Sequence, residues 1–210
     1  MLRVYGDVKA PISVVHHGVD PIFRPGGQRV PGLPDRYLLF VGNRGQYKDA
    51  NVLLSAFAAM RKKADGVALV FTGGGAFTRA ERAQQQELGI ADRVIQISLK
   101  DTAMSGAYGN ALMCVFPSRF EGFGLPALEA MACGTPALLA QGSSLPEVGG
   151  DAAKYFTPGD AQDLSVAIEG LLTDEQERNR MKIAGISRAQ GFTWGAAAAR
   201  TAGIYQSLVG

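Results

Sequence analysis

The sequence has few cysteines, little net charge and no long hydrophobic run, and each shortage excludes a class of protein. Its two cysteines, Cys114 and Cys133, stand in apolar stretches of the 210 residues, which favours buried free thiols over a disulfide framework. A net charge of +2 is too small to bind nucleic acid or an anionic membrane through an overall field. No run of about 18 apolar residues is present, which excludes a transmembrane helix, and no signal-peptide pattern opens the sequence. We therefore expect a cytoplasmic protein with no nucleic-acid partner.

Residues arranged for metal binding are also lacking. The sequence contains no Asp-x-Asp pair, and His16 and His17 have neither cysteine nor acidic partners at metal-ligand spacing. Hydrophobic residues make up 47% of the chain and charged residues 19%, which is typical of a globular protein with a substantial core. We expect a folded protein that needs no metal or other cofactor.

From residue 37 onwards, short apolar runs alternate with amphipathic stretches. The apolar runs predict six strands, at 37–42, 67–75, 93–98, 111–118, 135–141 and 152–156. Helical spacing occurs at 49–63, 77–88, 101–110, 126–133, 160–173, 174–188 and 193–208. This alternation predicts an α/β fold with a doubly wound, Rossmann-like parallel sheet. Ligands of such sheets bind at the carboxyl ends of the strands.

The first 36 residues have a different character. Residues 12–20 predict one short strand, whereas residues 23–36 are rich in Gly, Pro and Arg and resemble a linker. We therefore divide the chain into a lead-in strand and interdomain linker at 1–36 and a ligand-binding domain with C-terminal helices at 37–210.

Two glutamates flank a glycine-rich hinge in the stretch SRFEGFGLPALEAMACG, residues 118–134. Pro126 suits the first position of a helix, whose free N–H groups form an anion site. Gly122 and Gly124 allow a ligand to approach the main chain closely. Carboxylates on either side, Glu121 and Glu129, would repel a lone phosphate but would accept hydrogen bonds from sugar hydroxyls.

A nucleotide-sugar combines these requirements, because it has hydroxyl groups on both sides of a diphosphate. Its negative charge calls for cations, and the stretch VGNRGQYKD after the first strand offers Arg44 and Lys48. Taken alone, each glutamate would be an ordinary surface or helix-end residue; the combined pattern favours a ligand site.

The stretch EGFGLPALEAMACGTP resembles the signature of the retaining glycosyltransferases of family 4, the glycosyl transferases group 1 family. The same order of motifs surrounds it, with FVG and a lysine, FTGGG, SSLPEVGGDAA and a closing FTW. The similarity runs from about residue 10 to the end, and the residues of the motifs are most similar to those of mannosyltransferase-like members. The resemblance implies the C-terminal, donor-binding half of a GT-B enzyme, without the acceptor-binding N-terminal domain.

The resemblance also assigns roles to individual residues. It implies that Glu121 contacts the donor sugar near the reacting carbon as the catalytic residue and that Glu129 holds the ribose. The remaining donor-binding positions would meet the diphosphate and sugar: Arg44, Lys48, Gly122, Phe123, Gly124 and Leu125. Arg44 departs from the family pattern, which more often has arginine at the position of Asn43.

The implied reaction is metal-independent and retains the anomeric configuration. It would move a hexose, with mannose from GDP-mannose favoured over UDP-linked sugars, to a glycan or lipid acceptor in polysaccharide biosynthesis. Without the N-terminal domain, this chain would be catalytically incomplete. Peripheral contact of the full enzyme with the inner face of the membrane is left open.

Three alternatives remain at this stage. GFGLPA matches the G-x-G-x-x-A pattern of dinucleotide-binding domains, although five residues separate it from the preceding strand. A non-catalytic module that binds sugar nucleotides would carry the same site. An epimerase with GT-B architecture is disfavoured by the spacing of the two glutamates.

Overall fold

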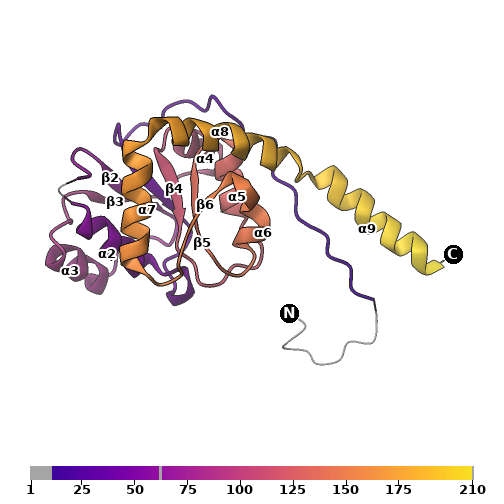
Figure 1. The fold of residues 1–210 in the computed structure, drawn as a ribbon, viewed down its shortest axis with the longest axis horizontal. Coiled ribbons are helices and arrows are strands. Elements are labelled where there is room, and N and C mark those ends of the chain that lie inside the picture. Colours follow the sequence, from indigo (N-terminus) through magenta and orange to yellow (C-terminus); the bar gives the residue numbers. More distant parts are fainter. Residues whose placement is uncertain (1–10, 62, 210) are drawn as a thin grey trace.

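A single six-stranded parallel sheet forms the centre of the protein (Figure 1). The structure, a computed structural model, describes residues 11–61 and 63–209. The strands lie in the order β3-β2-β1-β4-β5-β6, and every neighbouring pair is parallel. Their bounds are β1 Tyr37–Val41, β2 Ala68–Thr72, β3 Val94–Ile97, β4 Met113–Phe116, β5 Ala137–Ala140 and β6 Lys154–Phe156. The sequence-based prediction of a doubly wound sheet is confirmed, including its short sixth strand.

Helices cover both faces of this sheet. Their bounds are α2 Ala50–Ala59, α3 Arg79–Glu87, α4 Asp101–Gly109, α5 Leu125–Ala132, α6 Leu145–Gly149, α7 Ala161–Thr173, α8 Glu175–Gln190 and α9 Trp194–Val209. On one face α2 packs against α7, and on the other α5 contacts α4, α6 and α8. Right-handed crossovers require this division, because the chain reverses its direction across the sheet between β3 and β4. The reversal puts the switch point between β1 and β4.

The strands are buried because their runs are apolar on both faces. Every residue of β4 and β5 is buried, as are the first four residues of β1. Inside this core the Tyr37 hydroxyl donates to the Ala107 carbonyl of α4 at 2.6 Å. Burial raises the pKa of the Tyr37 hydroxyl, which keeps it a neutral donor. The sheet is therefore a rigid base for the loops at its carboxyl edge.

Two predicted helix ends differ from the structure. The predicted helix 49–63 ends at Ala59, so Arg61 and Lys63 lie beyond the helix, in a turn. Asp49 occupies the N-cap position in a left-handed conformation, but its carboxylate pairs with Arg119 and makes no cap bond. Helix α5 starts at Leu125, one residue before Pro126. The short helix α6 was not predicted, because five residues carry no periodic signal.

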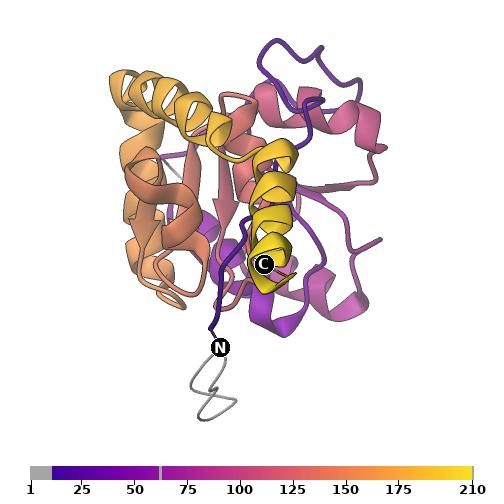
Figure 2. The same ribbon diagram turned by 90° about the vertical axis from the view of Figure 1, so that its right-hand side faces the viewer.

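The strand predicted at 12–20 does not form. Residues 11–20 have no regular secondary structure, and no pair of the sheet includes them. The segment instead runs beside α9 (Figure 2), where the Val19 N–H donates to the Phe192 carbonyl and the Arg200 Nε donates to the Val14 carbonyl. Extended apolar residues need a strand partner to become a strand, and here a helix takes that place. Residues 1–10 of the predicted lead-in lie outside the described residues.

The predicted linker, residues 23–36, is packed on the domain. The Ser105 hydroxyl of α4 donates to the Arg24 carbonyl, and the Asn110 side chain donates to the Gly27 carbonyl. Gly106 allows this contact, since a Cβ there would lie 2.1 Å from the Gln28 carbonyl oxygen. The segment therefore forms one wall of the domain. Within the described residues, no helix has both the length and the apolar character needed to cross a bilayer.

Candidate functional site

A cavity of about 550 Å³ opens at the carboxyl ends of β1 and β2. Its lining residues come from the lead-in segment, the last residues of β1 and β2 and the loops after them, the loop after β3, α4 and α5: Asp20, Ile22, Phe23, Val41, Gly42, Thr72, Gly73, Leu99, Asp101, Met104 and Glu129. This is the edge of the sheet at which a doubly wound fold binds its ligands. The volume is within the range typical of small-molecule sites.

Glu129 presents a carboxylate to this cavity. Its Oε2 atom accepts a hydrogen bond of 2.8 Å from the hydroxyl of the buried Tyr108. Burial raises the pKa of Glu129, the Tyr108 hydrogen bond opposes that effect, and the negative charges of Asp101 and Asp20 reinforce it. The ionised carboxylate is thus under-solvated, and hydroxyl donors from a ligand would stabilise it.

Lys48 and Glu121 form an ion pair beside the cavity. The Lys48 Nζ and the Glu121 Oε1 are 2.6 Å apart, and the two side chains are only 13% and 11% exposed. Gly42 connects the pair to the cavity, because a Cβ at that glycine would lie 3.9 Å from the Lys48 Nζ. The pair therefore places one positive and one negative group next to the space that Glu129 faces.

The N-terminus of α5, which follows the loop that carries Glu121, has free amides. Gly124 is its N-cap with φ of 99°, and no side chain caps the helix. Among the described residues, the N–H groups of residues 122–125 donate to no protein acceptor. Such amides, together with the helix dipole, favour an anion.

Two serines from the loop before α6 hold the residues between Glu121 and α5. The Ser143 hydroxyl donates to the Glu121 carbonyl at 2.7 Å, and the Ser144 hydroxyl donates to the carbonyls of Glu121 and Phe123 at 2.9 Å. The Glu121 N–H in turn donates to the Ser143 hydroxyl oxygen. The SSLPE motif thus acts as a brace for the loop, a role that its sequence alone did not indicate.

The lead-in segment also contacts this loop, through His16 and His17. The ring of Phe123 packs edge-on against His17, with centroids 5.1 Å apart, and also contacts His16 and Phe192 at 6.0 Å. The His16 Nε2 lies 2.6 Å from the Glu147 Oε1 of α6. The side chain of Phe123 therefore fixes the position of the loop.

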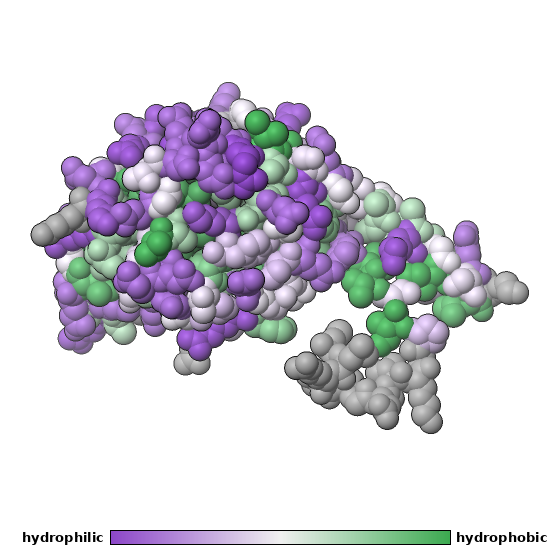
Figure 3. All heavy atoms as spheres, viewed as in Figure 1, coloured by the Kyte–Doolittle hydropathy of each residue, from purple (hydrophilic) through white to green (hydrophobic). Residues whose placement is uncertain are grey.

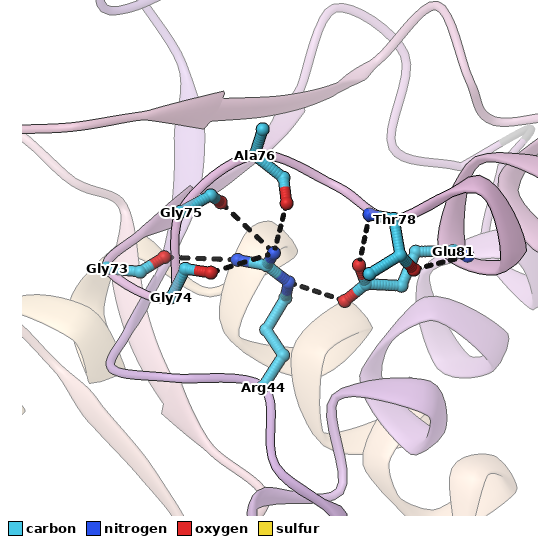
Figure 4. A network of polar contacts seen from close by, with 7 residues as sticks. All are labelled: Arg44, Gly73, Gly74, Gly75, Ala76, Thr78 and Glu81. Carbon is cyan, nitrogen blue, oxygen red and sulfur yellow. Dashed lines mark hydrogen bonds and ion pairs between the residues drawn. The ribbon is translucent and has the colours of Figure 1, made fainter.

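Arg44 lies in the loop after β1, as predicted, but its guanidinium is bound by protein partners. Its guanidinium is bound by Glu81 and by carbonyls of the turn at 73–76 (Figure 4), and only 6% of the side chain is exposed. The Nε and one terminal nitrogen are fully used by these partners, and the other terminal nitrogen donates to the Gly73 carbonyl, so most of the donor capacity of the guanidinium is used within the protein. The predicted contact between Arg44 and the diphosphate would therefore have to compete with these bonds.

The structure therefore brings most of the predicted site together. Lys48, Glu121, Glu129 and the amides of 122–125 gather around the switch point, whereas Arg44 faces another partner. Sequence reasoning missed Tyr108, Asp20 and Asp101. Nothing in the local sequence marks them as a group, because they come from α4 and from the lead-in segment, which only the fold brings together. In the described residues no three His, Cys, Asp or Glu side chains are placed to hold a metal ion.

Comparison with known proteins identifies a family for the chain. Residues 28–188 match the family described as glycosyl transferases group 1. The chain is 38% identical over 128 residues to the MMP alpha-(1->4)-mannosyltransferase of Mycolicibacterium hassiacum, an alignment that covers 59% of this chain and 31% of that enzyme. It is 34% identical to the D-inositol 3-phosphate glycosyltransferase 2 of Catenulispora acidiphila, over all of this chain and 53% of the relative.

A solved structure extends the likeness to the fold. The sucrose-phosphate synthase of Thermosynechococcus elongatus matches with a TM-score of 0.84 and 28% identity, over 99% of this chain and 55% of that one. The six-stranded sheet and its helices are those of one Rossmann-like unit of a GT-B glycosyltransferase. The chain belongs to the glycosyl transferases group 1 family. It spans about half the length of the inositol phosphate relative and of the synthase.

Proposed function

We propose that this chain is the donor-binding, C-terminal unit of a retaining hexosyltransferase that uses a nucleoside diphosphate sugar. The observation that carries the proposal is the grouping at the switch point of the sheet. An unpaired helix N-terminus, the Lys48–Glu121 ion pair and the cavity carboxylate of Glu129 all converge there. Each element suits one part of such a donor, and membership of the family supports the assignment.

The parts of the donor can be placed along the site in the order in which these groups lie. Glu129 accepts hydrogen bonds from the ribose hydroxyls inside the cavity, and the nucleobase lies against the wall at Leu99 and Asp101. The diphosphate rests on the amides of 123–125, with Lys48 as its counter-charge. Glu121 then faces hydroxyls of the sugar. Mannose is the favoured sugar, because one of the similar relatives is named a mannosyltransferase.

The proposed chemistry is same-face substitution at the anomeric carbon. The bond from that carbon to the diphosphate oxygen breaks, the bond to the acceptor oxygen forms, and the acceptor proton passes to the leaving diphosphate. Negative charge grows on the diphosphate in the oxocarbenium-like transition state. Lys48 and the α5 amides are fixed where they stabilise it, which is the role of a preorganised site.

A dinucleotide-binding function fits this site less well. In that motif the glycines form the tight turn directly after a strand. Here eight residues, 117–124, separate the end of β4 from the start of α5. Glu121, whose carboxylate is paired with Lys48, also stands directly before the glycines, and no such pair is part of that motif. The sugar-nucleotide assignment explains both features.

Binding of a panel of nucleotides tests the proposal. We expect GDP, GDP-mannose, UDP or a UDP-sugar to raise the melting temperature of this chain in a thermal-shift assay. At 100 times the dissociation constant, the gain is about 2.7 kcal/mol. NAD at the same concentration should give no shift, and Glu121→Ala should abolish the shift of the best sugar nucleotide. A shift with NAD and none with any nucleoside diphosphate would reject the assignment.

An apolar groove between the lead-in segment and α9 supports the second part of the proposal, that the other half of a longer protein docks here. The groove has a volume of about 640 Å³ and is lined mainly by Val15, His17, Trp194 and Tyr205 with the small side chains between them. Helix α9 projects from the body, and hydrophobic surface gathers along it (Figure 3). The similar proteins are about twice as long, so the acceptor-binding half is the occupant to which we commit.

Trp194 reports on this docking, because it is the one tryptophan of the chain and is 50% exposed. We expect its fluorescence to shift to shorter wavelength and its quenching by acrylamide to fall at least twofold when the chain is part of the two-domain protein. Tyr205→Ser should reduce both changes. Equal quenching in the two proteins would show that α9 is not covered.

A further inference from the structure

Arg44 lies at the centre of a network that joins two loops and the start of α3. Its Nε donates to the Glu81 Oε1 at 2.6 Å, and its two terminal nitrogens donate to the carbonyls of residues 73–76 at 3.0 to 3.4 Å. The guanidinium carbon also lies 4.8 Å from the centre of the Phe77 ring. Figure 4 shows the turn wrapped around the guanidinium. One terminal nitrogen donates to three carbonyls and the other donates to the Gly73 carbonyl, so every nitrogen of the guanidinium is engaged.

The turn held by Arg44 has an unusual backbone. Gly73, Gly74 and Gly75 all have positive φ, at 91°, 69° and 70°. Successive left-handed residues turn their carbonyl groups to one side, and these oxygens need donors. A planar guanidinium can serve several carbonyls at once, whereas a lysine ammonium is a compact point charge with no such fork. The three glycines and the arginine therefore depend on each other.

The same turn forms part of the cavity wall. Gly73 and Gly42 both line the cavity, and they are in close contact, because a Cβ at Gly73 would lie 2.9 Å from the Gly42 carbonyl oxygen. A shift of the turn would therefore change the shape of the cavity next to Gly42 and Thr72.

Glu81 fixes the other end of the network. Its carboxylate accepts from Arg44 and from the Thr78 N–H, and its own N–H donates to the Thr78 hydroxyl, which closes a capping box at the start of α3. Burial alone would raise the pKa of Glu81, but the hydrogen bonds from Arg44 and Thr78 outweigh it and hold the pKa below its usual range. The carboxylate is thus charged at neutral pH and balances the charge of Arg44.

We infer that Arg44 is a positioning residue, which keeps the 73–76 turn in the shape that binds the nucleoside half of the donor, and is not a ligand of the diphosphate. The link to the donor rests on the proposed function. The clamp itself, by which we mean the bonds of Arg44 to Glu81 and to the carbonyls of residues 73–76, follows from the contacts alone.

Nucleotide affinities distinguish a positioning role of Arg44 from direct binding of the diphosphate. If Arg44 acts through the cavity wall, Arg44→Ala should weaken a nucleoside monophosphate and the matching diphosphate by the same factor, about tenfold each. Arg44→Lys should give no rescue, and Glu81→Gln, which can still accept from Arg44, should have a smaller effect. Arg180→Ala, which breaks an exposed pair with Glu177 on α8, is the matched control and should change neither affinity. Titration calorimetry with GMP, GDP, UMP and UDP measures these ratios.

Hydrogen exchange measures the clamp without any nucleotide. We expect the amides of residues 74–77 to exchange at least ten times faster in Arg44→Ala than in the unaltered chain, while β1 and β4 stay protected. Glu81→Ala provides the same readout if Arg44→Ala does not fold. Unchanged exchange would overturn the inference, as would a loss of diphosphate affinity that exceeds the monophosphate loss tenfold. If the unaltered chain binds no nucleotide, the proposed function fails, and the exchange result alone decides the clamp.

Discussion

Lys48→Ala should lower the affinity for a nucleoside diphosphate about 30- to 100-fold and leave the monophosphate nearly unaffected. The ammonium of Lys48 is mostly buried and lies 2.6 Å from the Glu121 carboxylate. Removal of one partner of such a pair takes away a charge that favours the diphosphate and leaves an unpaired negative charge beside it. Losses of about 2–5 kcal/mol are typical for the truncation of a buried charged partner. Titration calorimetry with mono- and diphosphates measures the difference.

Two further variants separate the causes of this loss. Because part of the effect comes from the unpaired Glu121, the double variant Lys48→Ala/Glu121→Ala should bind a bare nucleoside diphosphate more tightly than Lys48→Ala alone. Lys63→Ala, which breaks an exposed ion pair with Glu169, should leave binding unchanged. A Lys48→Ala protein whose diphosphate affinity stays within threefold of the original would refute the placement of the diphosphate.

Glu129→Gln should make the free protein more stable and at the same time weaken nucleotide binding at least tenfold. The amide oxygen can still accept from Tyr108, so the packing is kept. The substitution removes a buried negative charge that Asp101 and Asp20 also disfavour. We expect a gain in melting temperature of roughly 2 °C at pH 7, equivalent to somewhat less than 1 kcal/mol for a chain of this length. A carboxylate, however, is the stronger acceptor for ribose hydroxyls.

The pH dependence of this effect has a definite sign. The pKa of Glu129 is raised in the folded protein, so the folded state binds more protons than the unfolded state between the two pKa values. Stability therefore falls as pH rises through that window, and the Glu129→Gln protein lacks this fall. The two proteins should converge in melting temperature at low pH and diverge towards neutrality. A lower melting temperature for Glu129→Gln at pH 7 would show that the charged carboxylate is stabilising.

Much of the fold could be predicted from local patterns. The six apolar runs are short, rich in Val, Leu, Ile and Phe and bounded by turns, and such runs become strands wherever both faces are covered. Helices α3, α4, α5, α7, α8 and α9 were each placed within about two residues, because their spacing and start signals are local. The strand predicted at 12–20 was wrong, since strand formation also requires a partner that the sequence does not identify.

For the site, the local part was again predictable. Glu121, Glu129 and the glycines between them lie on one loop and one helix, and the chemistry of a free helix N-terminus depends only on that stretch. These residues and the α/β alternation were sufficient to assign the family.

Which charges meet was decided by the tertiary structure alone. Lys48 and Arg44 are four residues apart and carry the same charge, so their sequence makes them equivalent candidates for the diphosphate. The fold sends Lys48 to Glu121, 73 positions away, and Arg44 to Glu81 and the glycine turn after β2. The physical reason is that each cation, once buried, must be satisfied by partners within about 3 Å, and those partners lie in segments that follow strands which are neighbours only in the folded sheet.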